Sequence, residues 1–191
     1  MSTQLENLGI KIQEGYKKEN LIPKPDLVIV GNVIRRDYEE PQALLASDIP
    51  YTSLPKAIGD FVIEDRHSIV LSGTHGKTTT TSMMSWIAEC AGLKPGFMIG
   101  GIPKNFSYSF KVPGGENNQK NYFVIEGDEY DTAFFDKVPK FIHYKPRSVI
   151  LTSVEFDHAD IYKDLDHVKS AFVKLMEMIP TDGNLVYWYE G

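Results

Sequence analysis

The sequence predicts an α/β fold with mostly parallel sheets and flanking helices, and three observations lead to it. Short apolar runs that suit buried strands alternate with helical patterns along the 191 residues. A glycine-rich turn joins one of these runs directly to a helix. Polar residues follow three of the runs, and the carboxyl ends of parallel strands meet at one edge of a sheet. That edge is therefore where we expect a ligand site.

The expected elements follow one another along the chain, with one loop-like stretch at 103–121. We expect strands at residues 27–30, 68–72, 122–125, 148–151 and 185–188, and helices near 41–47, 55–64, 77–91 and 165–179. The apolar face of the third helix is expected to contain Met83, Met84, Ile87, Ala88 and Ala91. That of the last helix is expected to contain Leu165, Val168, Phe172, Leu175, Met176 and Ile179. A boundary near Glu64–His67 divides the chain into residues 1–66 and 67–191.

Composition excludes several classes of protein. A formal net charge of −6 argues against a nucleic-acid binder that relies on a broad basic face. The single cysteine, Cys90, excludes a disulfide framework within the chain and a cysteine-based zinc site. No apolar run approaches the ~18 residues of a membrane span, and the first residues do not read as a secretory signal. We therefore expect a cytoplasmic protein that does not act at a membrane.

The strongest local motif lies between the second expected strand and the following helix. The candidate nucleotide-binding residues are Gly73, Thr74, His75, Gly76, Lys77, Thr78 and Thr79. Glycines let backbone N–H groups approach phosphate oxygens, the lysine neutralises the outer phosphates, and a threonine hydroxyl can bind Mg²⁺. The longer P-loop pattern would need glycine where the chain has Leu71, so a shortened motif remains. The alternative interpretation is a structural glycine-rich turn.

Acidic residues follow the third and fourth strands of this sheet. Glu126 and the pair Asp157-His158 stand at strand ends that face the glycine loop, and Mg²⁺ prefers oxygen ligands beside phosphates. The alternatives without a catalytic role are a solvated loop for residues 126–131 and a structural role for His158. A basic stretch is expected to be solvated, and three other histidines are expected to be structural. These residues are Lys137, Lys140, Lys145 and Arg147, and His67, His143 and His167.

Four segments taken together resemble the Mur ligase family over nearly the whole chain. They are GTHGKTTTT at 73–81, FVIEGDEYDTAFF at 123–135, FIHYKP at 141–146 and EFDHADI at 155–161. The resemblance implies a truncated Rossmann-like N-terminal piece that binds UDP-muramate and a partial P-loop-type central ATP domain. It also implies a bacterial, ATP-dependent amide ligase of peptidoglycan recycling that uses Mg²⁺. Its substrates would be UDP-N-acetylmuramate and the tripeptide L-alanyl-γ-D-glutamyl-meso-diaminopimelate, joined through an acyl phosphate.

The resemblance also assigns roles to residues. Lys77, Glu126 and His158 would be catalytic, with Thr78 and Glu126 holding one Mg²⁺ and His158 helping to hold a second. The substrate would lie near Asp128, Glu129, Thr152 and Ser153.

The chain departs from the family pattern in three places. Ser153 stands where relatives have asparagine, and a hydroxyl cannot replace both ends of an amide. Several relatives carry a carbamylated lysine in the register of Phe172 or Val173, with Lys174 one position away, so that role is not assigned. The first βα unit and the C-terminal domain of the family have no counterpart in this sequence. We therefore expect the 191 residues alone to bind nucleotide weakly and not to ligate.

Other functions stay open. The nearest is the ligation of UDP-N-acetylmuramate to L-alanine in place of the tripeptide. A small P-loop kinase or NTPase and a non-catalytic nucleotide-binding module are the alternatives from other classes. A dinucleotide oxidoreductase is disfavoured because no GxGxxG turn is present. The sequence leaves the oligomeric state open.

Overall fold

The computed structural model describes residues 2–113, 121–156 and 162–188. The N-terminal third contains α1 (Ser2–Asn7), η1 (Lys18–Leu21), β1 (Val28–Val30), α2 (Glu39–Leu45), β2 (Tyr51–Ser53), α3 (Leu54–Ala57) and η2 (Ile58–Ile63). The middle contains β3 (His67–Ser72), α4 (Lys77–Cys90), β4 (Gly96–Met98), β5 (Phe110–Lys111) and β6 (Tyr122–Gly127). The remainder contains β7 (Asp131–Ala133), β8 (Asp136–Pro139), η3 (Lys140–Tyr144), β9 (Ser148–Leu151), α5 (Leu165–Glu177) and β10 (Asn184–Tyr187).

A six-stranded sheet organises the larger part of the molecule, in the order β10-β9-β3-β6-β4-β5. Every neighbouring pair in it is parallel except β4 with β5. In this register Ser72 of β3 lies opposite Gly127 of β6 and Leu151 of β9. The three strands that are followed by polar residues in the sequence, β3, β6 and β9, are thus neighbours in the sheet. Their carboxyl ends lie side by side.

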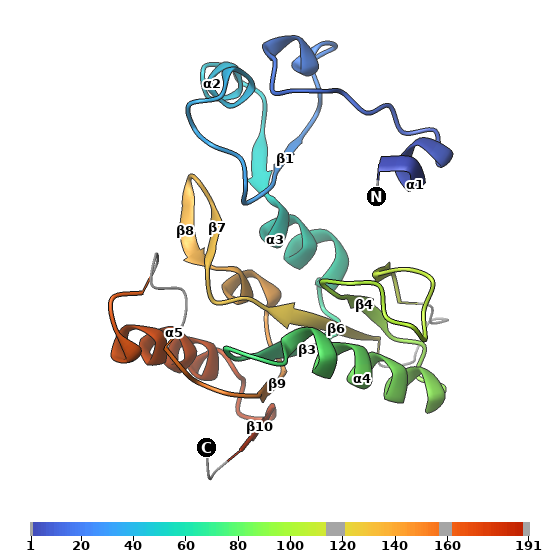
Figure 1. Cartoon of the computed structure of the whole chain (residues 1–191), viewed down its shortest axis with the longest axis vertical. Helices are drawn as coiled ribbons and strands as arrows, with labels where there is room; N and C mark the ends of the chain where they lie inside the picture. The colour runs from blue at the N-terminus through green and yellow to red at the C-terminus, as the bar shows by residue number, and fades with distance from the viewer. Residues whose placement is uncertain (1, 114–120, 157–161, 189–191) are drawn as a thin grey trace.

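Alternate residues of the strands enter two different cores. Val70, Phe123 and Ile125 pack on one face with α5, η2 and η3. Leu71 and Val124 pack on the other, together with Phe97 and the partly buried Met84 of α4. Helices therefore cover both faces, which confirms the predicted α/β class, and Figure 1 shows α4 and α5 beside the sheet.

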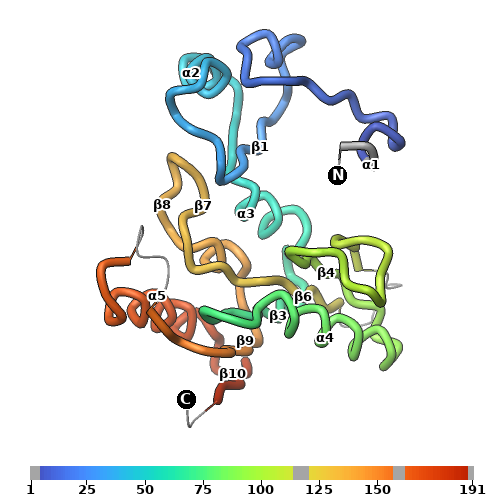
Figure 2. Tube along the Cα trace, viewed as in Figure 1, coloured from blue at the N-terminus to red at the C-terminus, as the bar shows by residue number. Residues whose placement is uncertain are grey.

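The N-terminal part forms a small unit of its own, above the sheet in Figures 1 and 2. Strands β1 and β2 pair in parallel, with Val28 opposite Tyr51. Its core contains the buried residues Leu21, Val30, Leu44 and Ile49. The β7–β8 hairpin reaches it, because Phe134 packs against this core and Phe135 contacts the ring of Tyr51 edge-on. Helix α3 and the π-helical turn η2 lead from this unit down to β3.

The structure corrects three details of the expected elements. Strand β6 continues through Glu126 and Gly127, because their backbones pair with Leu71 and Ser72 of β3. Residues 131–139 form a hairpin and 96–98 a strand, neither of which was expected. The described helices include none with the length and apolar character needed to cross a bilayer.

The predicted buried face of α4 is partly wrong. Met83 and Ile87 are each 58% exposed, whereas Thr81, Ser85 and Ala88 are buried. Small side chains let this helix lie close to the sheet, so the bulky residues turn outward. The predicted face of α5 is confirmed, because Val168, Phe172 and Leu175 are buried in it.

Candidate active site

The glycine-rich loop between β3 and α4 depends on two backbone conformations that disfavour side chains. Gly73 has φ +130°, and a Cβ there would lie 2.3 Å from Thr152 Oγ1 and 2.8 Å from the Ser153 nitrogen. Gly76 has φ +81° and directly precedes α4. Both values lie in the left-handed region that glycine reaches without strain. The motif therefore forms a tight turn that ends at the amino terminus of a 14-residue helix.

Residues that follow β9 hold this loop in place. The Thr74 N–H donates to the Ser153 carbonyl at 2.9 Å, and the His75 N–H donates to Ser153 Oγ at 3.1 Å. Thr152 Oγ1 donates to the His75 carbonyl at 2.5 Å, and the Glu155 N–H donates to Thr74 Oγ1 at 2.9 Å. Thr152 and Ser153, expected near the substrate, thus lie against the loop backbone. His75 has an exposed side chain and contributes to the loop through its backbone.

Lys77, at the start of α4, folds back over the loop. Its ammonium group donates to the Gly73 carbonyl at 2.7 Å and lies 3.0 Å from Glu129 Oε2. The two side chains are 12% and 2% exposed, so this ion pair is buried. Glu129, also expected near the substrate, therefore faces the loop lysine.

Glu126 lies next to the loop on the neighbouring strand. Thr78 Oγ1 donates to Glu126 Oε2 at 3.0 Å, and the Gly100 N–H donates to Oε1 at 2.6 Å. A Cβ on Gly100 would meet this carboxylate at 3.2 Å, so glycine allows the close approach. Two donors thus fix the carboxylate at the end of β6, beside the first turn of α4.

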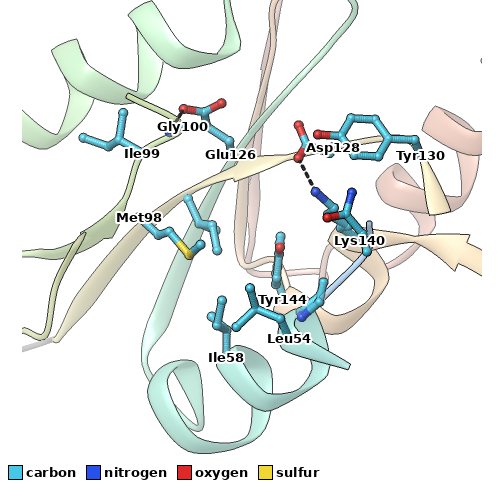
Figure 3. Close-up of a pocket in the computed structure, with 13 residues that line it drawn as sticks. Leu54, Ile58, Met98, Ile99, Gly100, Glu126, Asp128, Tyr130, Lys140 and Tyr144 are labelled. Carbon is cyan, nitrogen blue, oxygen red and sulfur yellow. Dashed lines mark hydrogen bonds and ion pairs between the residues drawn. The ribbon is translucent and has the colours of Figure 1, made fainter. Parts of the chain in front are cut away.

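A cavity of about 230 Å³ opens on the other side of Glu126. Its wall combines an apolar part with polar groups, and Figure 3 shows Leu54, Ile58 and Met98 on one side with Asp128, Tyr130 and Lys140 on another. Further lining residues are Asn32, Pro55, Ile99, Gly100, Ile125 and Tyr144. The cavity therefore lies between the N-terminal unit and the sheet, and Glu126 both lines it and accepts a hydrogen bond from Thr78 at the start of α4.

Lys140 is the cation of this cavity, and the sequence analysis missed it. Its ammonium lies 2.9 Å from Asp128 Oδ2 and 4.2 Å from the centre of the Tyr130 ring. Figure 3 marks the contact with Asp128 by a dashed line. Its side chain is 16% exposed, so the expectation of a solvated Lys140 is wrong. The short turn η3, which follows the β7–β8 hairpin, returns this lysine to the end of β6. No helical or strand periodicity links Lys140 with Asp128 in the sequence, so the sequence alone does not indicate this contact.

Three tyrosines around these carboxylates hold their protons more tightly than usual. Burial, reinforced by the nearby charge of Asp128, raises the pKa of Tyr130 and of Tyr144 well above 10. Burial and the charge of Glu129 raise the pKa of Tyr162 to about 12. The Tyr162 hydroxyl also donates a hydrogen bond to the Glu129 carbonyl. All three phenols therefore keep their protons to a higher pH than an ordinary tyrosine does.

The remaining expected residues have different outcomes. Thr79 lies in the first turn of α4 with an exposed side chain. His158, expected to hold a metal, lies outside the described residues, as does Asp157. His67 and His143, expected to be structural, contact Ser148 at 2.8 Å and Asp136 at 2.8 Å. Within the described ranges no group of three or more His, Cys, Asp or Glu side chains is arranged to hold a metal.

Comparison with known proteins identifies the class to which this fold and site belong. Residues 71–191 match the family described as the Mur ligase middle domain, and residues 1–66 match the Mur ligase family, catalytic domain. The chain belongs to the Mur ligase family, and the resemblance seen in its motifs is confirmed.

Comparison with individual proteins is consistent with membership of this family. The chain is 48% identical over 187 residues to the UDP-N-acetylmuramate–L-alanyl-γ-D-glutamyl-meso-2,6-diaminoheptandioate ligase of Escherichia coli (strain K12), covering 98% of this chain and 40% of that protein. It is 34% identical over 186 residues to the UDP-N-acetylmuramate–L-alanine ligase of Acetivibrio thermocellus, covering 97% of this chain and 37% of that protein.

A solved structure confirms the fold. The crystal structure of the UDP-N-acetylmuramate:L-alanyl-γ-D-glutamyl-meso-diaminopimelate ligase from Neisseria meningitides superimposes with a TM-score of 0.94 at 45% identity. It covers 100% of this chain and 60% of that one. The chain spans about 40% of the length of the curated relatives described above.

Proposed function

We propose that this chain is the nucleotide- and muramate-binding part of an ATP-dependent ligase that joins UDP-N-acetylmuramate to L-alanyl-γ-D-glutamyl-meso-diaminopimelate. In this proposal residues 1–66 contribute to the UDP-muramate site, and residues 67–191 carry the ATP site. Identity of 48% to a relative named for the tripeptide, against 34% to one named for L-alanine, supports the tripeptide. We also propose that this ligase acts in the bacterial cytoplasm.

One observation carries the proposal: Glu126 of β6 contacts the glycine-rich loop and also lines the cavity. Its carboxylate accepts from Thr78 of the loop helix, and it also lines the cavity between the N-terminal unit and the sheet. A donor bound to the loop and an acceptor bound in the cavity would therefore meet at this residue. Bringing two reactants together in a fixed orientation is a large source of rate enhancement in group transfer.

The residues around Glu126 suit Mg²⁺. The hydroxyl of Thr78 and the carboxylate of Glu126 are hard oxygen donors 3.0 Å apart, and Mg²⁺ is often bound by one or two protein oxygens together with phosphates and water. When bound, Mg²⁺ would neutralise charge on the transferring phosphoryl group. The Gly100 N–H donates to the other carboxylate oxygen and holds the group beside Thr78.

The chain's own residues would then act mainly by positioning and by charge. We propose that Lys77 and the N–H groups of the first turn of α4 bind the β- and γ-phosphates, while the cavity holds the muramate carboxylate in line with the γ-phosphorus. An oxygen of that carboxylate forms a bond to phosphorus as the bond to ADP breaks, which gives an acyl phosphate. The tripeptide amine then attacks the acyl carbon, and inorganic phosphate leaves as the amide forms and the amine proton is lost.

The ligation assay tests this function directly. The protein that carries this sequence is incubated with ATP, Mg²⁺, UDP-N-acetylmuramate and either the tripeptide or L-alanine, and ADP and the amide product are quantified. We expect product with the tripeptide, with ADP and phosphate formed in equal amounts. Preference for L-alanine would instead indicate the ligation of UDP-N-acetylmuramate to L-alanine.

Two further results would contradict the proposal. ATP-dependent phosphorylation of a small acceptor without any need for an amine would indicate a kinase. Absence of Mg²⁺-dependent ATP binding would indicate a non-catalytic module. The 191-residue chain alone is expected to bind nucleotide weakly and to give no turnover, so its titration with ATP accompanies the assay.

A further inference from the structure

Glu129 makes the most buried ion pair found in the described part of the chain. Its Oε2 and Oε1 atoms lie 3.0 Å and 3.3 Å from Lys77 Nζ, and the two side chains are 2% and 12% exposed. The pair Lys140–Asp128 is more open, at 16% and 17%, and Lys24–Asp48 is at the surface, at 57% and 84%. A buried charge is costly unless it is paired, so the partnership of Glu129 with the loop lysine is strongly favoured.

The backbone of Glu129 is held in place on the side away from the loop. The Tyr162 hydroxyl donates to the Glu129 carbonyl, and Tyr162 itself is 5% exposed. Thr132, three residues further on, is fully buried and donates to the Val138 carbonyl at 2.8 Å. The backbone that carries Glu129 is therefore anchored, with its carboxylate beside the Lys77 ammonium.

The ammonium of Lys77 already has acceptors for its three protons. It donates to the Gly73 carbonyl at 2.7 Å and contacts both oxygens of Glu129, with the Thr74 carbonyl at 3.4 Å. A phosphate that approaches this ammonium must replace at least one of these contacts. It also brings negative charge toward a buried carboxylate, and such repulsion is weakly screened inside a protein.

We propose that Glu129 is a positioning residue for Lys77: it holds the ammonium over the glycine-rich loop and competes with the outer phosphates for it. This inference rests on the nucleotide site proposed above and assigns to Glu129 an action through Lys77 rather than a contact with substrate. The contact keeps the loop lysine ordered before nucleotide arrives. It also makes the site selective for polyphosphates, because a small single anion gains too little binding free energy to displace the carboxylate.

Titration of the full chain with inorganic triphosphate tests this without adenine, metal or ligation chemistry. Glu129→Gln keeps the shape and an acceptor but removes the charge, so we expect it to bind triphosphate about tenfold tighter than the parent chain. Glu129→Asp keeps the charge and is the matched control, which should not tighten binding. Folding of each variant is checked by its circular dichroism and unfolding midpoint.

Lys77→Met separates this role from a general loosening of the structure. If Glu129 acts through Lys77, the double variant Lys77→Met/Glu129→Gln loses most of the gain that Glu129→Gln shows alone. A gain of the same size in the Lys77→Met background would overturn the proposal. The proposal would also be overturned if the parent binds triphosphate and Glu129→Gln binds it with equal or weaker affinity. In that case the proposed nucleotide site is unaffected.

Binding by Glu129→Gln where the parent shows none would support the proposal. Absence of triphosphate binding in the parent and in every variant would remove both the proposed nucleotide site and this inference.

Discussion

The two sides of the carboxyl end of β6 are built in different ways. On one side lies the phosphate loop, seven consecutive residues whose shape is set by two glycines and by hydrogen bonds to residues 152–155. On the other side lies the cavity, whose wall comes from five separate segments around Asn32, Leu54, Met98, Asp128 and Lys140. The loop is thus built from residues that are local in the sequence, whereas the cavity depends on how the N-terminal unit meets the sheet.

The largest effect is expected on the loop side, from loss of the buried ion pair. Lys77→Met leaves the Glu129 carboxylate buried without its ammonium, so the free energy of unfolding should fall by about 3–5 kcal/mol. Urea unfolding followed by circular dichroism measures this. Lys24→Met, at an exposed pair, should change the free energy of unfolding by no more than about 1 kcal/mol. Equal losses in the two variants would contradict the buried character of the loop pair.

A smaller effect on the same side concerns the loop backbone. Gly73→Ala places a Cβ against Thr152 and Ser153 at positive φ, and should lower the free energy of unfolding by about 2–4 kcal/mol. Gly92→Ala is the matched control, because Gly92 has φ +75° but no atom within 4 Å of the added Cβ. It should lower this free energy by about 1 kcal/mol. Chemical denaturation of both variants checks the difference, and a Gly92→Ala loss as large as that of Gly73→Ala would argue against close packing of the loop.

On the cavity side, the expected effect is on binding. Lys140→Met removes the cation that pairs with Asp128, and should weaken UDP-N-acetylmuramate about tenfold while leaving the affinity for ATP unchanged. Lys137→Met, which removes an exposed pair with Asp131 on the adjacent hairpin, is the control and should change neither affinity. Isothermal titration with each ligand separates the two sides. A parallel loss of both affinities would show that the loop and the cavity are not distinct.

The smallest effect is the pH dependence that Tyr162 adds. Its pKa is raised to about 12 in the folded chain, from the ordinary tyrosine value of about 10, so its contribution to stability is complete below about pH 10. The contribution is lost as the pH rises from about 10 to about 12, because the unfolded chain loses the proton first. Tyr162→Phe should make the fall in unfolding free energy across this window less steep. The exposed Tyr187→Phe is the control, and an unchanged slope in Tyr162→Phe would contradict the shift.

The same contrast explains how much could be predicted from the sequence. Gly73, Lys77 and Thr78 are close in the chain, and an apolar run followed by a helix defines their surroundings, so the loop was predictable. Glu126 was predictable because it follows a buried run at the same sheet edge. The assignment of roles to these residues stays a proposal.

The parts that could not be predicted depend on tertiary contacts. Lys140 reaches Asp128 only because the β7–β8 hairpin turns the chain back, and that hairpin lacks a strong alternating pattern. The buried face of α4 was misjudged because Thr81 and Ser85 pack on the sheet where larger residues would not fit, leaving Met83 exposed. Size complementarity of this kind is a property of two surfaces and cannot be read from one helix.

The central claim is that Glu126 links the metal-bound nucleotide to the cavity, and the Mg²⁺ dependence of ATP affinity tests it most directly. ATP is titrated into the protein that carries this sequence and into its Glu126→Gln variant, each with and without Mg²⁺. The account predicts that Mg²⁺ strengthens ATP binding to the parent chain and that Glu126→Gln loses this dependence. ATP without metal should bind the variant at least as tightly as the parent, because a negative charge has been removed. A Glu126→Gln variant that keeps the full Mg²⁺ dependence would contradict the account.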